Sequence, residues 1–429
     1  MWRGNVVTRR LAAYCSAALT VCPVALAGLL VVLYLDVTTP WVRQHDVEAH
    51  REYIEHLFTH RALPPVLQGW ETWQPPLYYV AAALWRASFS AFPFDDPFRP
   101  VQYLAALLYL TAILAAVPIF RRLKLNAVEG VGALSLLAVL PANLFLAARI
   151  NNDVLLPLLG AGVMLVTAEF IRTGRRRWLW WLAFLLPAAL ATKGSSLAIA
   201  GGSLALVLWA ELRRSGWWPA LWQTYLTALP AAIWELAWSL RTLAQTGNPL
   251  YVNATLLPDE LRVCAPAWRR LLSFDFAAFL GGAVYYDEPV RQSYPMALLT
   301  SLVYGEYGMH EYTFHWPELL RWGCLGLVLL LAAGALVAPR AELRPVWITC
   351  LVLAGFQALL AVVYAVQFAY ACNQDMRFYA QTFVPLACLC GLGIGHFWQE
   401  AGWIGRCVVL VVAIVLLLGL ADFYRALLF

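Results

Sequence analysis

Apolar runs of about 20 residues recur along most of this chain, and short charged breaks separate them. An α-helix rises about 1.5 Å per residue, so a run of this length can cross about 30 Å of hydrocarbon. Only 13% of the 429 residues are charged, whereas 62% are hydrophobic. So few charges cannot cover a water-exposed surface. The sequence therefore predicts an all-α polytopic membrane protein and excludes a soluble globular domain.

We expect about eleven transmembrane helices. The first apolar run is too long for the apolar region of a signal peptide, and no convincing cleavage motif of small residues follows it. We therefore interpret it as the first span. The expected spans cover residues 11–35, 99–120, 127–148, 153–171, 178–192, 194–211, 219–241, 317–338, 346–370, 379–398 and 404–424.

Basic residues gather in alternate breaks between the expected spans. By the positive-inside rule these breaks are cytoplasmic, which places the N-terminus in the cytoplasm and predicts a multi-pass protein of the plasma or inner membrane. The chain is then one membrane domain, 1–429, with two long extracytoplasmic segments, 36–98 and 242–316. The basic breaks contain Arg9, Arg10, Arg121, Arg122, Lys124, Arg172, Arg175, Arg176, Arg177, Arg213, Arg214, Arg340 and Arg344.

The first extracytoplasmic segment begins with HDVEAHREYIEHL, residues 45–57, whose apolar residues recur at helical spacing. We expect juxtamembrane amphipathic helices here, and a second helix within 75–91 that lies in the interface rather than crossing the membrane. Asp46 and His50 are four residues apart and therefore share one face of the first helix. A structural alternative is that Asp46 only caps the helix N-terminus.

Histidines and cysteines offer weak metal or disulfide signals. His56 and His60 could form an inter-loop metal site with a second set of residues, His310, His315, Glu306 and Glu311, in a stretch that is also a candidate acceptor-binding surface. The nine cysteines form no CxxC pair and no zinc spacing. A disulfide between Cys264 and Cys372 is conceivable, but free thiols are the favoured interpretation.

Four motifs follow one another in order over about 340 residues. GWETWQPPLYY (69–79) follows the acidic residue after the first span, RINND (149–153) lies between spans 3 and 4, TKGSS (192–196) joins two short spans, and DMRFYAQTFVP (375–385) begins a late span. Together they resemble the C-type glycosyltransferase superfamily, most of all bacterial protein-mannosyltransferase-like enzymes and the aminoarabinose transferase of lipid A. Ionisable side chains near lipid are costly, so the charged residues in these motifs should face a polar cavity or each other.

The resemblance implies a membrane enzyme that moves a sugar from a polyprenyl-phosphate donor to an acceptor hydroxyl or amine on the extracytoplasmic face, with inversion. Lys193 and Arg377 would bind the donor phosphate, and Asp46 would act as the base, oriented by His50 or assisted by Asp153. A salt-bridge cluster that ties helix ends together is the structural alternative. Further substrate-binding candidates are Glu48, Glu71, Gln74 and Tyr78.

Cofactor, partners and rival functions complete these expectations. We expect no required cofactor and no metal ligand set, although a divalent cation stays open because Asp46-Val47-Glu48 resembles a double-acid motif. The expected partners are the lipid-linked donor, membrane lipid, and a glycan, lipid or protein acceptor, with no nucleic acid. Two rivals stay open, namely a transporter or flippase of lipid-linked sugar, and a non-catalytic membrane protein of envelope assembly.

Overall fold

The computed structural model describes residues 6–41, 46–305, 314–337 and 339–428. The structure is 78% helical, and the described residues contain no strand apart from an isolated bridge between Arg262 and Tyr370. The predicted all-α class is confirmed. His45 and part of the predicted second metal and acceptor surface, residues 306–313, lie outside the described residues.

The helices follow the apolar runs of the sequence. The α-helices are α1 (Val6–Asp36), α2 (Val47–His60), α3 (Leu77–Ser88), α4 (Arg99–Arg122), α5 (Ala127–Val139), α6 (Pro141–Leu146), α7 (Leu156–Thr173), α8 (Arg177–Leu190), α9 (Leu197–Ser215), α10 (Trp217–Thr246), α11 (Ala267–Leu272), α12 (Phe276–Leu280), α13 (Glu288–Arg291), α14 (Tyr294–Tyr304), α15 (Pro317–Leu336), α16 (Arg344–Gln367), α17 (Phe383–Gln399) and α18 (Gly402–Leu428). The 3₁₀ helices are η1 (Asn152–Leu155), η2 (Gly194–Ser196), η3 (Asn253–Leu256), η4 (Asp259–Leu261), η6 (Ala341–Leu343), η7 (Ala371–Gln374) and η8 (Met376–Thr382).

Seven helical stretches in the described chain are long and apolar enough to cross a membrane. The apolar helices α5 (Ala127–Val139) and α8 (Arg177–Leu190) are shorter than these, and α10 is not among the seven. The predicted total of eleven spans is therefore not confirmed. The seven stretches are Arg99–Arg122, Asn152–Thr173, Gly194–Ser215, Pro317–Leu336, Ala341–Gln367, Ala371–Gln399 and Gly402–Leu428.

One expected span is interrupted. The stretch 127–148 was expected to be continuous, but α5 ends before Leu140, whose backbone is extended at φ −68° and ψ 128°. Pro141 follows, and a residue before proline is driven out of the helical region by the proline ring. Asn143 compensates in part, because its Nδ2 donates to the carbonyl oxygen of Leu137 at 3.2 Å.

Small residues let the long helices approach closely. A Cβ on Gly334 would lie 1.8 Å from the carbonyl oxygen of Leu389, and one on Gly393 would lie 1.9 Å from that of Leu330. These contacts bring the backbones of α15 and α17 together, as small residues do in membrane helix pairs. α17 thereby lies at the centre of the bundle, packed against α5, α15, α16 and α18.

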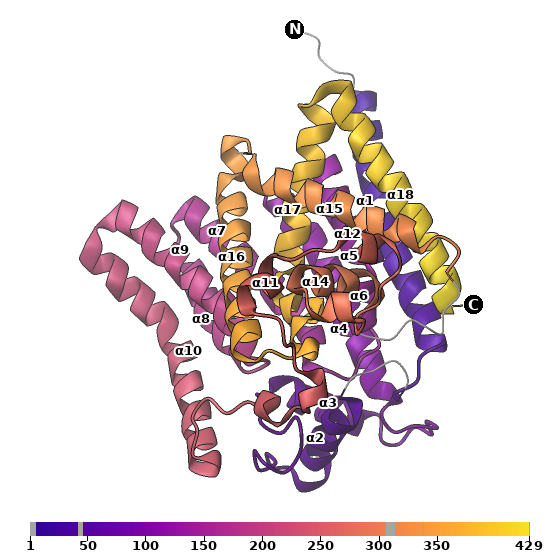
Figure 1. Cartoon of the computed structure of the whole chain (residues 1–429). Helices are drawn as coiled ribbons and strands as arrows, with labels where there is room; N and C mark the ends of the chain where they lie inside the picture. The colour runs from indigo at the N-terminus through magenta and orange to yellow at the C-terminus, as the bar shows by residue number, and fades with distance from the viewer. Residues whose placement is uncertain (1–5, 42–45, 306–313, 338, 429) are drawn as a thin grey trace.

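Figure 1 shows α2 and α3 at the lower end of the bundle, opposite the connections between α9 and α10 and between α17 and α18. α3 has 12 residues, too few to span a bilayer. Its first residue is tied to the end of α8, where the backbone N–H of Leu77 donates to the carbonyl of Ala191 at 2.8 Å. An ion pair of 2.5 Å between Arg86 and Glu55 joins α3 to α2.

The second long segment folds into short helices against the bundle. The buried guanidinium of Arg321 donates to the carbonyls of Phe279 and Ala283. Nearer the first segment, Nδ2 of Asn253 donates to the carbonyl of Trp70 at 2.6 Å. Loops 62–76 and 247–261 are therefore held together at the end of the bundle that carries α2 and α3.

Candidate functional site

A cavity of about 490 Å³ lies where the two long segments meet the helix bundle. Four residues singled out from widely separated motifs, Asp46, His50, Lys193 and Arg377, line it together, as do Glu71 and Gln74. Its walls also include tryptophan, tyrosine and leucine side chains from α9, α10, α16 and the loop 249–261. The cavity wall thus contains both charged groups and apolar side chains.

Lys193 reaches the cavity from the loop between α8 and α9. Its backbone is extended, at φ −160° and ψ 137°, because α8 stops at Leu190 and the chain must turn before η2 begins. The ammonium Nζ lies 2.5 Å from Oδ1 of Asp153. The Lys193 side chain is 11% exposed and the Asp153 side chain 0%. Lys193 therefore faces the cavity while Asp153 lies behind it.

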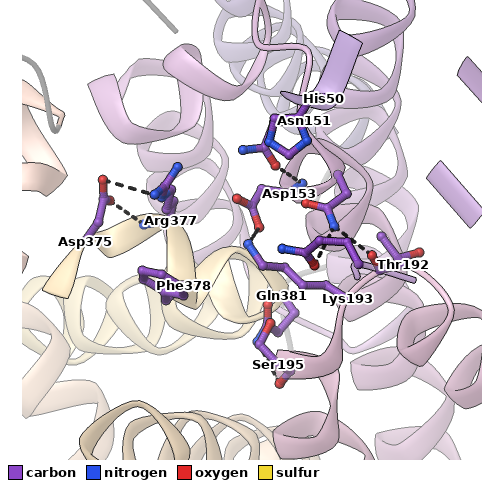
Figure 2. Close-up of polar contacts among 12 residues, drawn as sticks. His50, Asn151, Asp153, Thr192, Lys193, Ser195, Asp375, Arg377, Phe378 and Gln381 are labelled. Carbon is purple, nitrogen blue, oxygen red and sulfur yellow. Dashed lines mark hydrogen bonds and ion pairs between the residues drawn. The ribbon is translucent and has the colours of Figure 1, made fainter. Parts of the chain in front are cut away.

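The asparagines beside Asp153 fix this loop. Oδ1 of Asn151 accepts from the backbone N–H of Asp153 at 2.7 Å and begins η1. Nδ2 of Asn152 donates to the carbonyl of Thr192 at 2.9 Å and to Oε1 of Gln74 at 3.2 Å. The Asn152 amide thus joins three of the sequence motifs. Figure 2 shows Asn151 and Thr192 near the Lys193 and Asp153 pair.

Arg377 comes from η8, at the start of the α17 segment. Asp375 begins this 3₁₀ helix by accepting from the backbone N–H of Arg377 at 2.7 Å, and its carboxylate lies 3.9 Å from the guanidinium. The ring centroid of Phe378 lies near both cations, 5.2 Å from Nζ of Lys193 and 5.5 Å from the guanidinium carbon of Arg377. An aromatic face attracts cations at such distances, so Phe378 supports both side chains (Figure 2).

A buried amide pair holds η8 against the rest of the site. Nε2 of Gln381 donates to the carbonyl of Ser195 at 3.2 Å and to Oε1 of Gln357 at 2.5 Å. Nε2 of Gln357 in turn donates to the carbonyl of Phe378 at 2.8 Å. The loop that carries Lys193 and the turn that carries Arg377 are therefore joined through side chains from α16 and η8.

Asp46 lies on the cavity wall at the entry to α2, and it is exposed. Its backbone is left-handed, at φ 53° and ψ 20°, and its side chain makes no capping hydrogen bond. N-cap residues normally have extended backbone, from which the side-chain oxygen reaches the N–H groups of the first turn. The capping alternative is therefore wrong, and the carboxylate is available to the cavity.

His50 is a buried neutral side chain. Its Nδ1 lies 2.8 Å from Oη of Tyr79 in a hydrogen bond, and the rings of Tyr53 and Tyr79 stack at 4.0 Å. Burial lowers the pKa of His50 to about 3; among the nearby charges, that of Asp153 raises this pKa, and those of Lys193 and Arg377 lower it. The hydrogen bond of His50 goes to Tyr79 rather than to Asp46.

Glu71 is a second carboxyl group on the cavity wall, 6% exposed. Burial, and after it the negative charge of Asp46, raise the pKa of Glu71 to about 8. Its Oε2 forms no hydrogen bond with the described residues. Glu71 is therefore neutral at pH 7, and a protonated carboxyl can donate a hydrogen bond to a bound molecule.

The remaining candidates lie in different places. Gln74 lines the cavity and binds Asn152. Tyr78, in the first turn of α3, is fully buried, and Glu48 is exposed on α2. Neither residue lines the cavity. Asp153 is not on the wall either, but holds Lys193 from behind.

Several site residues were not singled out from the sequence. Gln357 and Glu235 are polar residues inside apolar runs, a signal that marks functional positions in membrane helices. Gln381 and Phe378 lie within the fourth motif but were not distinguished from their neighbours. Cys264 and Cys372 do not form a disulfide with each other.

Metal-ligating side chains do not cluster in the described residues, which contain no group of three or more histidine, cysteine, aspartate and glutamate side chains placed to hold an ion. His56 and His60 stack on each other with ring centroids 4.4 Å apart. Of their predicted partners, Glu306, His310 and Glu311 lie outside the described residues, whereas the backbone N–H of His315 donates to Oδ2 of Asp422 at 2.8 Å.

No protein-family model matches the sequence, and no curated protein sequence matches it. Solved structures do match. The archaeal oligosaccharyltransferase AglB from Archaeoglobus fulgidus, in complex with an inhibitory peptide and a dolichol-phosphate, superposes with a TM-score of 0.54 at 13% identity, over 97% of this chain and 56% of AglB. ArnT from Cupriavidus metallidurans, bound to undecaprenyl phosphate, superposes with a TM-score of 0.51 at 18% identity, over 95% of this chain and 76% of ArnT.

Both of these structures are C-type glycosyltransferases. The chain spans little more than half the length of AglB, so the likeness concerns the shared helical part alone. At these identities it establishes an architecture and not an activity. This chain has the fold of the C-type membrane glycosyltransferases.

Proposed function

We propose that this chain is a membrane glycosyltransferase that moves a sugar from a polyprenyl-phosphate donor to an acceptor hydroxyl or amine. One observation carries the proposal. The two cations Lys193 and Arg377 and the two carboxyl groups Asp46 and Glu71, which come from four separate segments of the chain, line the same cavity. Dolichol-phosphate and undecaprenyl phosphate in the AglB and ArnT complexes support a lipid phosphate as the ligand.

The cations suit the donor phosphate. In a transfer reaction the bond between the anomeric carbon and the phosphate oxygen breaks, and its electron pair stays on the phosphate. Charge that develops there is stabilised by cations already in position. The ion pair with Asp153 and the contact with Phe378 keep Lys193 in place before the donor arrives.

Asp46 is the base of the proposed reaction. The acceptor oxygen or nitrogen attacks the anomeric carbon on the face opposite the phosphate, and the Asp46 carboxylate takes the proton that the acceptor loses. A single displacement inverts the anomeric centre. Asp46 suits this role because its side chain is exposed to the cavity and is not used in capping.

The other polar groups position the substrates. Neutral Glu71 donates a hydrogen bond to a sugar or acceptor oxygen, while neutral His50 supports Tyr79 and the α2 face from which Asp46 projects. In this scheme Asp153 positions Lys193. The proposed domain boundaries, with the extracytoplasmic segments 36–98 and 242–316 around the site, place the reaction on the outer face of the cell membrane.

Turnover of a labelled undecaprenyl-phosphate sugar by the purified full-length protein tests the proposal. Asp46→Asn should reduce transfer by about a thousandfold or more, since a positioned base contributes about 10²–10⁴, and leave undecaprenyl phosphate binding unchanged. Glu52→Gln is the matched control, because Glu52 is exposed on the same helix and does not line the cavity. Full activity of the Asp46 variant refutes the base, and lipid movement without turnover in proteoliposomes identifies a flippase instead.

A further inference from the structure

The face of α10 that borders the cavity is polar. Glu235, Trp238, Ser239 and Thr242 line the cavity at positions i, i+3, i+4 and i+7, which is the spacing of one helix face. We call Glu235, Ser239 and Thr242, with the indole of Trp238, the α10 stripe. The same helix exposes leucine and isoleucine on its other side, at Ile233, Leu236, Leu240 and Leu243.

The opposite wall of this part of the cavity is different. α16 contributes Gln357, Leu360, Ala361 and Tyr364, also at i, i+3, i+4 and i+7. Both helices pack against α9 and line the cavity, and Figure 1 shows α10 at the edge of the bundle and α16 nearer its centre. An apolar and aromatic wall on α16 therefore faces a polar stripe on α10, so the two sides of the cavity suit different parts of an amphiphilic molecule.

Glu235 is the unusual member of the stripe. It lies 11 residues before the end of α10 at Thr246, about 16 Å of helix rise, inside a stretch of otherwise apolar sequence. Its side chain is half-buried, and none of the described residues forms a hydrogen bond or ion pair with it. Placing a carboxyl group this far along the helix, inside an apolar stretch, costs free energy, and such a group is expected to have a functional partner.

The chemistry of the stripe limits what this partner can be. A carboxylate only accepts hydrogen bonds, and hydroxyls of serine and threonine both donate and accept. A phosphate has no hydrogen to offer a carboxylate and would be repelled. A ligand that is rich in hydroxyl groups fits, and the flat face of Trp238 offers apolar contact to its C–H groups.

We propose that the α10 stripe is a binding subsite for the hydroxyl groups of a lipid-borne carbohydrate, separate from the phosphate subsite at Lys193 and Arg377. The inference deepens the proposed glycosyl transfer and rests on it. Two substrates could supply this carbohydrate, namely the sugar of the donor or a glycolipid acceptor. Both carry the same chemistry into the cavity along α10, with their apolar tails toward the α16 wall.

Binding of three lipids to the full-length protein in nanodiscs, measured by native mass spectrometry, tests the stripe without requiring turnover. The probes are undecaprenyl phosphate, undecaprenyl phosphate glucose and glucosyl diacylglycerol. In the double variant Glu235→Gln/Ser239→Ala we expect affinity for at least one glucolipid to fall about tenfold, as expected for the loss of a hydrogen bond to a charged group. Binding of undecaprenyl phosphate should stay within twofold, which also shows that the variant is folded. Leu236→Ala, on the exposed face of α10, should change none of the three.

The pattern of losses separates the sources. A loss for undecaprenyl phosphate glucose alone assigns the stripe to the donor sugar, and a loss for glucosyl diacylglycerol alone assigns it to the acceptor. Equal binding of both glucolipids by variant and wild type overturns the proposal, as does an equal loss for undecaprenyl phosphate itself. If the wild type does not bind undecaprenyl phosphate, the proposed function fails, and the stripe is then judged on glucosyl diacylglycerol alone.

Discussion

Lys193 and Asp153 form an ion pair, and removing Lys193 should have the opposite effect on lipid phosphate binding from removing Asp153. Lys193→Met removes a cation from the cavity wall, so affinity for undecaprenyl phosphate should fall. Asp153→Asn removes the carboxylate behind that cation, so the charge of Lys193 is no longer partly neutralised and the affinity should rise. A purely structural salt bridge predicts no such opposition.

The structure also predicts unequal effects of the two variants on stability. At 2.5 Å the gross attraction is about 6 to 7 kcal/mol at an effective dielectric constant of about 20, most of which offsets the cost of desolvation. Lys193→Met leaves a carboxylate with 0% exposure unpaired, which costs about 3–5 kcal/mol. Asp153→Asn leaves a lysine that is 11% exposed to the cavity, so water can reach it and the cost should be smaller.

Thermal unfolding in detergent, followed by intrinsic tryptophan fluorescence, measures this difference. For 429 residues the entropy of unfolding is about 0.9 kcal/mol/K, so the loss in Lys193→Met should lower Tm by about 3–5 °C. The double variant Lys193→Met/Asp153→Asn removes both charges and should be more stable than Lys193→Met alone.

Two results would refute this reasoning. If Lys193→Met unfolds at the wild-type temperature, Asp153 is not buried behind it in the way described. If the two losses simply add in the double variant, the side chains do not interact, because contacting groups show a coupling energy in such a cycle. Undecaprenyl phosphate affinity measured on the same four proteins then decides whether Lys193 faces the ligand.

Three further predictions follow from the site and its packing. Affinity for undecaprenyl phosphate should fall as pH rises through about 8, because Glu71 is protonated below this pKa and adds a negative charge above it, and Glu71→Gln should remove that dependence between pH 7 and 9. Transfer activity should show no change due to His50 between pH 5 and 8, since His50 stays neutral above about 3, and a His50→Asn variant should therefore have the same profile shape. Gly160→Ala should destabilise the protein by about 1–3 kcal/mol and weaken lipid phosphate binding, because its Cβ would lie 1.8 Å from the carbonyl oxygen of Gln381. Gly355→Ala is the control, because its Cβ would have no neighbouring atom within 4 Å. This variant should be neutral or slightly stabilising in the same thermal assay.

The helical architecture could be predicted because apolar run length is a direct physical requirement of membrane insertion. The stretch 178–192, for example, matches α8 (Arg177–Leu190) closely. The break at Leu140 was missed, since the run 127–148 is mostly apolar and the proline after Leu140 is the main signal of an interruption. The 3₁₀ start of the α17 segment was also missed, because Asp375 acts there as a local cap that composition does not reveal.

The sequence could predict only those residues of the site that are charged and lie within or next to apolar stretches. Lys193 and Arg377 stood out because ionisable groups near lipid need a reason. Sequence could not tell that Asp153 lies behind Lys193 while Glu71 faces the cavity, because burial depends on how distant segments pack. The rotational phase of α10, which turns Glu235 toward the cavity, likewise depends on its packing against α8 and α9.

Each cation of the cavity has a carboxylate beside it, Asp153 for Lys193 and Asp375 for Arg377. In the proposed reaction the donor phosphate is a diester with one negative charge, whereas the released lipid phosphate is a monoester that carries about −1.5 to −2 at pH 7. Cations without counter-ions would therefore bind the product more strongly than the donor and slow its release. A carboxylate beside each cation weakens product binding. The same carboxylate still holds the cation in position for the next donor. Asp153→Asn should accordingly slow release of undecaprenyl phosphate more than it improves donor binding, and pre-steady-state measurement of a product burst in this variant, compared with wild type, distinguishes such a role from a merely structural one.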